Sequence, residues 1–185
     1  MGEANRKEAV AALHRAQIMT AAEKLFSEKG YEQTTIEDIS KEAEYSRRTI
    51  YTYYESKEDI LHRIIEKGLQ ASKTDIENAV KDNAGFVEAY RAVCGAMRKY
   101  RREYPHSLER LNRSGDEEIG QAVKSVAVQN ILRLGTEINE TLEALIIRGQ
   151  ESGEVRKDIV PTLTVYVLWS SLDSLLNLAG TKGKF

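Results

Sequence analysis

The sequence predicts an all-α fold. Along most of the chain, apolar residues recur at the three- and four-residue spacing of one helical face. The 185 residues include only two prolines and twelve glycines, and no stretch shows the alternating pattern of a half-buried strand. This length permits one large domain or two small ones with a real core. The contents of 41% apolar and 30% charged residues are typical of a soluble globular protein.

The segment Thr34–Lys57 predicts two short helices joined by a tight turn, with a third helix close behind. Thr34 and Glu37 have the spacing of a capping box at the start of the first short helix. Ser46 is placed to cap the second short helix, and Ser56 is placed to cap the third. The inward face of the first short helix is marked by Ile36, Ile39 and Ala43.

The second short helix, Arg47 to Tyr54, carries the chemistry of this segment. At about 100° per residue, Ile50 and Tyr54 fall on one side and Arg48 on the other. Thr49 and Thr52 share the Arg48 side, and Tyr51 and Tyr53 flank it. No acidic residue lies between Tyr45 and Tyr54. Such a surface suits a DNA major groove, since Arg donates two bonds to guanine and Tyr hydroxyls reach phosphates. A solvated helix with two ordinary arginines is the alternative for a helix this short.

Helical periodicity also predicts the remaining elements. The first helix runs to about Lys29 and is capped by Gly30. A linking helix starts at Lys57, and another helix runs from Phe86 to the residues before Tyr104-Pro105. The later elements are a short helix to Arg113, a loop over residues 112–116, a long helix from Glu117 to about Arg148 with a possible break near Gly135, a turn over residues 149–158, and a final helix from Pro161 to Leu178.

The final helix is apolar nearly all round. A membrane span is a poor interpretation, because Asp173 and Asn177 interrupt the helix and no basic segment precedes it. We expect one side of the helix to pack on its own core and the other on a second copy of the chain. The sequence therefore predicts a homodimer formed through the C-terminal helices and no membrane partner.

Charge and reactive residues argue against several classes of function. The net charge is −2, and residues 1–67 carry 11 Lys or Arg against 13 Asp or Glu, so any nucleic-acid binding must come from a local patch. The three histidines lack metal-ligand spacing and stand beside no nucleophile, which predicts no enzyme, no metal site and no cofactor. The lone Cys94 predicts a reducing, cytoplasmic setting. Its thiol is expected in the core, with redox sensing as the alternative.

Residues 15–61 resemble the DNA-binding region of the tetracycline-repressor (TetR-like) family of regulators. The residues that carry the resemblance are Ala21, Ala22, Leu25, Phe26, Gly30, Tyr31, Thr34, Thr35, Ile36, Ile39, Ser46, Thr49, Tyr51, Tyr53, Lys57 and Glu58. The resemblance implies phosphate contacts from Thr35, Tyr51, Tyr53 and Lys57. It places Arg47, Arg48, Thr49 and Thr52 on the helix that reads the bases, with Ser46 at its start. A dimer of this kind binds a near-palindromic duplex.

The chain departs from the family pattern at three places. Glu44 and Tyr45 occupy a turn that usually holds Gly and a small apolar residue. Glu44 therefore implies either an energetic cost or a different turn. Arg48 replaces a usual Gly, which adds a candidate base reader. Tyr54 stands where Phe is common, and we expect it in the core with its hydroxyl at an edge.

The resemblance also implies a C-terminal domain that binds a ligand and forms the dimer. It predicts a helix-turn-helix domain over residues 1–56, a connecting helix over 57–83 and a ligand-binding and dimerisation domain over 84–185. The candidate pocket residues are Phe86, Tyr90, Met97, Tyr100, Tyr104, Tyr166 and Trp169. They favour a small apolar or aromatic ligand, with an ordinary core as the competing interpretation.

The function implied is a dimeric transcriptional repressor that a small molecule releases from its operator. Ligand binding acts in this way only if the ligand favours one conformation over another. The alternative is a helical binding module whose head has lost specific DNA binding, which Glu44 and the acidic surroundings suggest.

Overall fold

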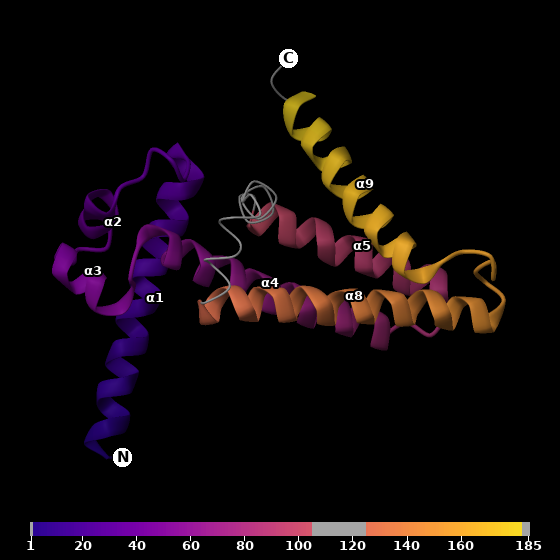
Figure 1. The fold of residues 1–185 in the computed structure, drawn as a ribbon, viewed down its shortest axis with the longest axis horizontal. Coiled ribbons are helices and arrows are strands. Elements are labelled where there is room, and N and C mark those ends of the chain that lie inside the picture. Colours follow the sequence, from indigo (N-terminus) through magenta and orange to yellow (C-terminus); the bar gives the residue numbers. More distant parts are fainter. Residues whose placement is uncertain (1, 105–124, 183–185) are drawn as a thin grey trace. The chain divides into compact units, whose positions relative to one another are not determined.

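The computed structural model describes residues 2–104 and 125–182. These residues form seven helices, shown in chain order from indigo to yellow in Figure 1. The bounds are α1 Glu3–Lys29, α2 Ile36–Glu42, α3 Arg47–Tyr53, α4 Lys57–Lys81, α5 Phe86–Glu103, α8 Val126–Ser152 and α9 Pro161–Lys182. The all-α prediction is therefore confirmed for this part of the chain. The short helix and loop predicted before residue 117 lie outside it.

The described chain divides into two compact units. One unit holds residues 2–70 with 100–104 and 125–132, and the other holds residues 71–99 and 133–182. Helices α4, α5 and α8 each supply residues to both units. The three-part domain division made from the sequence stays a prediction.

In the first unit, α2 and α3 pack against α1 and form the N-terminal head (Figure 1). Ile18 of α1, Ile39 of α2 and Ile50 of α3 are completely buried at its centre. Ile60 and Ile65, on the first half of α4, are also completely buried. Branched apolar side chains from four helices thus stabilise the head and hold α3 in place.

The predicted helix ends are mostly confirmed. Gly30 terminates α1 with φ 85°, and its N–H donates to the Phe26 carbonyl. Ser46 caps α3 by accepting a bond from the Thr49 N–H. Ser56 accepts a 3.0 Å bond from the Asp59 N–H before the first turn of α4. Each cap satisfies backbone groups that a helix end leaves without partners.

The predicted capping box at Thr34 and Glu37 is wrong by one residue. Thr35 is the N-cap of α2, and its hydroxyl accepts a 3.1 Å bond from the Asp38 N–H. Asp38 accepts the Thr35 N–H in return at 2.9 Å. The Thr34 hydroxyl is buried and donates to the Gly30 carbonyl at 2.8 Å, so it cannot serve as the cap.

Two predictions about α8 are also corrected. This helix continues through Gly135 without a break, because neighbouring residues such as Leu134 and Ile138 are almost fully buried and hold it in place. It extends to Ser152, four residues beyond Arg148. The turn that follows contains Gly153 with φ 81°, a conformation that favours glycine.

The second unit is held together by contacts among α4, α5, α8 and α9. Arg148 of α8 donates to the carbonyls of Val80 and Asn83, at 3.2 and 3.1 Å, where α4 ends. Lys99 of α5 pairs with Asp75 of α4 at 2.7 Å. The Trp169 indole of α9 donates to the Asn139 side chain of α8 at 2.9 Å. None of the helices built from the described residues has the length and hydropathy that a membrane crossing needs.

Candidate DNA-binding site

Helix α3 presents a polar face on a buried support. Ile50 is fully buried and Tyr54 is nearly so, whereas Arg48 and Thr52 are exposed on the opposite side. The Tyr54 hydroxyl donates to the Arg15 carbonyl at 3.0 Å, and burial raises the pKa of Tyr54 to about 12. The predicted core role of Tyr54 is therefore confirmed. This packing fixes which face of α3 is available to a partner.

The polar side chains of α3 differ in their bonding. Arg47 lies 3.8 Å from Glu37, and both side chains are largely exposed, so the pair is weak. Arg48 has no ion-pair partner among the described residues. The Thr49 and Thr52 hydroxyls are bonded within the helix, to the Ser46 hydroxyl at 2.8 Å and to a backbone carbonyl at 3.0 Å. Arg48 is thus the side chain of α3 best placed to donate to a new acceptor.

The turn between α2 and α3 contains a left-handed residue. Glu44 has φ 58°, the only positive φ of a non-glycine residue within the described part of the chain. The Cβ of an L-residue crowds the following carbonyl in this conformation, at a cost of about 1–2 kcal/mol. The sequence predicts either an energetic cost or a different turn at Glu44, and the structure shows the first, a strained turn that usually takes glycine. The strain is local, since α2 ends and α3 begins where the sequence predicts.

Side chains of α1 and the turn surround Tyr53 on one flank of α3. The Tyr53 hydroxyl lies 2.8 Å from His14 Nδ1, and the Arg15 guanidinium lies 5.7 Å from the Tyr53 ring centre. Tyr45 packs against the His14 ring, and its hydroxyl donates to the Gln17 side chain. Tyr51, on the other flank, is 51% exposed. The two tyrosines therefore differ, because only Tyr53 is fixed to α1.

Lys57 and Asp38 stabilise the approach to α2. The Lys57 ammonium donates to the carbonyls of Tyr31 and Thr34, at 2.8 and 2.9 Å, and lies 4.1 Å from the Tyr31 ring centre. Asp38 pairs with Lys29 at 2.8 Å. Hydrogen bonds from Lys29 and then from Thr35 lower the pKa of the Asp38 carboxyl. Both charged groups thus hold the segment that carries Thr35, which is itself exposed.

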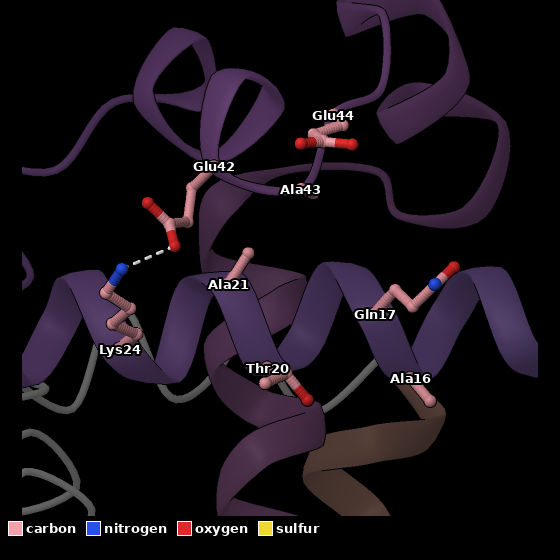
Figure 2. Close-up of a pocket in the computed structure, with 8 residues that line it drawn as sticks. All are labelled: Ala16, Gln17, Thr20, Ala21, Lys24, Glu42, Ala43 and Glu44. Carbon is pink, nitrogen blue, oxygen red and sulfur yellow. Dashed lines mark hydrogen bonds and ion pairs between the residues drawn. The ribbon is translucent and has the colours of Figure 1, made fainter.

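An open groove of about 400 Å³ lies on the head beside this turn. Figure 2 shows α1 as its floor, with Glu42, Ala43 and Glu44 on the opposite side. Lys24 and Glu42 form a 2.6 Å ion pair at one end of the groove (Figure 2). That pair joins α1 to the end of α2. The groove is lined by mostly small or polar residues: Ala16, Gln17, Thr20, Ala21, Lys24, Glu42, Ala43 and Glu44.

A second cavity, of about 230 Å³, lies within the second unit. Its lining comes from α5, α8 and α9: Tyr90, Val93, Cys94, Met97, Leu142, Leu145, Ile146, Leu168 and Ser171. Among these residues only Tyr90, Cys94 and Ser171 carry a polar side-chain group, and none carries a formal charge at neutral pH. Cys94 is half-buried in this wall. The cavity therefore suits an apolar molecule or an apolar part of one.

Two of the seven predicted pocket residues, Tyr90 and Met97, line this cavity. Phe86 stacks on Tyr90 at a ring distance of 5.9 Å. Tyr100 and Tyr104 stack on each other in the first unit, at 5.6 Å. Tyr166 is 60% exposed, and Trp169 is bonded to α8. The leucines and isoleucine that α8 contributes were not predicted as pocket residues, because their helical spacing is typical of ordinary core residues.

A capped helix, a tight turn and a second helix with an exposed basic face define a helix-turn-helix DNA-binding protein. The sequence model described as "Bacterial regulatory proteins, tetR family" matches residues 18–64, which contain this whole unit. The HTH-type transcriptional repressor NicS of Pseudomonas putida is 31% identical over 159 residues, covering 85% of this chain and 73% of NicS. The chain belongs to the tetR family. It is a DNA-binding transcriptional regulator and not an enzyme, as the sequence predicts.

Solved structures agree with this assignment over both units. PfmR, a TetR family transcriptional regulator from Thermus thermophilus, superposes with a TM-score of 0.70 at 27% identity, covering 86% of this chain and 84% of PfmR. FadR from Bacillus subtilis, solved with stearoyl-CoA, superposes with a TM-score of 0.69 at 20% identity, covering 91% of this chain and 88% of FadR. The predicted fold, a helix-turn-helix head followed by a helical C-terminal region, is confirmed.

Proposed function

We propose that the chain is a homodimeric repressor that binds a near-palindromic duplex through α3 and is released by a small apolar ligand. The observation that carries the DNA-reading part is the exposed face of α3, which is basic and polar, has no acidic residue and is supported by the buried Ile50. A seven-residue helix held in this way offers its first turns to a major groove.

In this proposal, side chains of the head have two kinds of role. Arg48 reads a base, because its side chain is exposed and has no ion-pair partner within the described residues. Arg47 gives up its long contact with Glu37 for the duplex, while Thr49 and Thr52 line the groove. The groups assigned to the DNA backbone are Thr35, Ser46, Tyr51, Tyr53 and Lys57. These contacts position the protein, whereas the base contacts select the sequence.

The proposed dimer uses the exposed apolar side chains of α8 and α9. Leu163, Tyr166 and Val167 are 60–63% exposed, and Ile147 of α8 is 44% exposed. Val165, between them in the sequence, is buried, so α9 has apolar residues on more than one face. We infer that a second copy covers the outer face, because a two-fold dimer also presents two copies of α3 to a palindrome. Leu163→Glu is expected to yield monomers in analytical ultracentrifugation, and Glu151→Gln, at an exposed site, is the control.

The proposed ligand enters the cavity between α5, α8 and α9. The likeness to FadR, which was solved with stearoyl-CoA, supports an acyl chain as the class to test first. The uncharged lining supports the same choice, since it offers no cation for an acid group. We expect stearoyl-CoA to bind in calorimetry. Leu142→Trp, which puts a larger side chain into the cavity wall, is expected to weaken that binding. Val87→Trp, on the exposed face of α5, is the control that should bind as the parent does.

The base-reading role is tested with Arg48→Ala and Lys57→Ala on a set of duplexes with single base changes. Loss of one bidentate contact lowers discrimination at one position by about 1–3 kcal/mol. Arg48→Ala is therefore expected to relax the base preference at that position. Lys57→Ala is expected to weaken binding to every duplex alike. If both variants bound every duplex as the parent does, the assigned contacts would be wrong.

A further inference from the structure

The imidazole of His14, on α1, holds Tyr53 in place, and His14 is not among the predicted DNA-contact residues. His14 Nδ1 lies 2.8 Å from the Tyr53 hydroxyl oxygen. The two rings meet nearly edge to face, with centres 5.6 Å apart and planes at 78°. On its other side His14 contacts the Tyr45 ring, with centres 5.1 Å apart. The imidazole is therefore fixed between α3 and the turn that precedes it.

This contact decides what the Tyr53 hydroxyl can offer to a third group. A phenol has one proton to donate, and an unprotonated Nδ1 is an acceptor that takes this proton. The hydroxyl then shows only lone pairs outward, and these repel a phosphate oxygen. When Nδ1 carries a proton, in the neutral Nδ1–H tautomer or in the imidazolium, it donates to the Tyr53 oxygen, and the phenolic proton becomes free for a phosphate. The imidazolium differs from the neutral tautomer in its positive charge, which a nearby phosphate favours.

The groups described in contact with His14 are uncharged, so the proposed phosphate is the negative charge that would favour its protonation. Tyr53 comes from α3 and Tyr45 from the turn, and both are uncharged phenols at neutral pH. On α1 itself the neighbouring charge is Arg15, which pairs with Glu8 at 3.1 Å. A phosphate on Tyr53 would bring a negative charge about 5 Å from Nδ1, at two hydrogen-bond lengths, and would favour the protonated imidazole.

We propose that His14 is a positioning residue of the DNA-binding site, which sets the donor direction of the Tyr53 hydroxyl and couples DNA binding to the uptake of a proton. The proposal rests on the proposed contact between Tyr53 and a phosphate. It adds a residue of α1 to the site, and it predicts tighter binding as the pH falls from 8 to 6.

The test measures the dissociation constant of a duplex between pH 6 and 8 at constant ionic strength, using the duplex that the parent enriches from a random pool. The parent is expected to bind about fivefold more tightly at pH 6 than at pH 8. His14→Gln keeps a polar side chain that does not titrate and is expected to lose this gain. His62→Gln, on α4, is the control that should retain it.

Tyr53→Phe distinguishes an effect of His14 through the Tyr53 hydroxyl from a direct effect of the His14 charge on DNA binding. It removes only the hydroxyl, so the gain at low pH should disappear even though His14 is present. A gain that persisted in Tyr53→Phe, or a parent without pH dependence, would overturn the proposal. Matched melting curves for the three variants show that each is folded.

A second readout does not depend on DNA. Nitrogen NMR of the free protein reports which imidazole nitrogen carries the proton, and Tyr53→Phe is expected to change the protonation of His14 Nδ1. Unchanged signals would refute the hydrogen bond itself. If the parent enriched no duplex while this change was seen, the proposed function would fail and the contact between His14 and Tyr53 would stand.

Discussion

Replacing Glu44 by glycine should stabilise the protein. The residue sits at φ 58° in the turn before α3, where a Cβ costs about 1–2 kcal/mol. Glycine removes that cost but loses about 0.4–1 kcal/mol through the greater freedom of the unfolded chain. The net gain expected is therefore about 0.8 kcal/mol, the middle of a range of about 0–1.6 kcal/mol, and in a chain of this length about 0.8 kcal/mol raises Tm by about 2–3 °C.

Glu44→Ala is the matched control, because it removes the carboxylate and keeps the Cβ. Thermal and urea unfolding of the parent, Glu44→Gly and Glu44→Ala are compared at pH 7. Glycine should be the most stable of the three, and alanine should stay close to the parent. If alanine stabilised the protein as much as glycine, the carboxylate and not the backbone would be the cause. If neither did, the left-handed conformation of Glu44 would cost no more than the roughly 0.4–1 kcal/mol that glycine loses through the unfolded chain, and the predicted net gain would be refuted.

Three further changes test other parts of the head and the second unit. Lys57→Met removes two charge-assisted bonds to backbone carbonyls and should lower the free energy of unfolding by about 1.5–3 kcal/mol in urea titrations; a variant as stable as the parent would contradict this role. The bond from Lys29 lowers the pKa of Asp38, so the ionised carboxylate adds stability above the ordinary carboxyl pKa. The parent should therefore have a larger free energy of unfolding than Asp38→Asn at pH 6, and this difference should shrink below about pH 4. A difference that did not change with pH would refute this. Gly149→Ala places a Cβ 2.6 and 2.7 Å from two side chains and should lower the free energy of unfolding by about 1–3 kcal/mol. Gly135→Ala has open space and should stabilise α8 by about 0.5–1 kcal/mol in the same assay. Equal effects would show that the side chains around residue 149 move to make room for the Cβ.

Local sequence chemistry predicts most of the head. Ser46 and Gly30 act as caps, because an oxygen before a helix and a residue without Cβ after it satisfy backbone groups that have no other partner. The inward positions of Ile50 and Tyr54 follow from helical spacing. Glu44 shows that the turn keeps its shape even with an unfavourable residue, because the packing of α2 and α3 on α1 outweighs the strain.

Other features depend on contacts distant in the sequence. Thr34 with Glu37 and Thr35 with Asp38 have the same spacing, and only burial of the Thr34 hydroxyl against Gly30 decides between them. The bond between His14 and Tyr53 joins residues 39 positions apart, and no local pattern marks it. The α8 wall of the cavity likewise has the spacing of any core helix. Such features follow from the packing of helices, which a single sequence specifies only indirectly.

The central claim is that α3 of a dimer reads a specific duplex. The most direct measurement is a selection of bound sequences from a random duplex pool, run in parallel with the parent and with Tyr51→Ala, whose exposed ring is assigned to a phosphate. We expect the parent alone to enrich a near-palindrome with half-sites about one or more helical turns apart. If a folded, dimeric parent enriched no sequence, the claim would be contradicted, and the chain would be a helical binding module without specific DNA recognition.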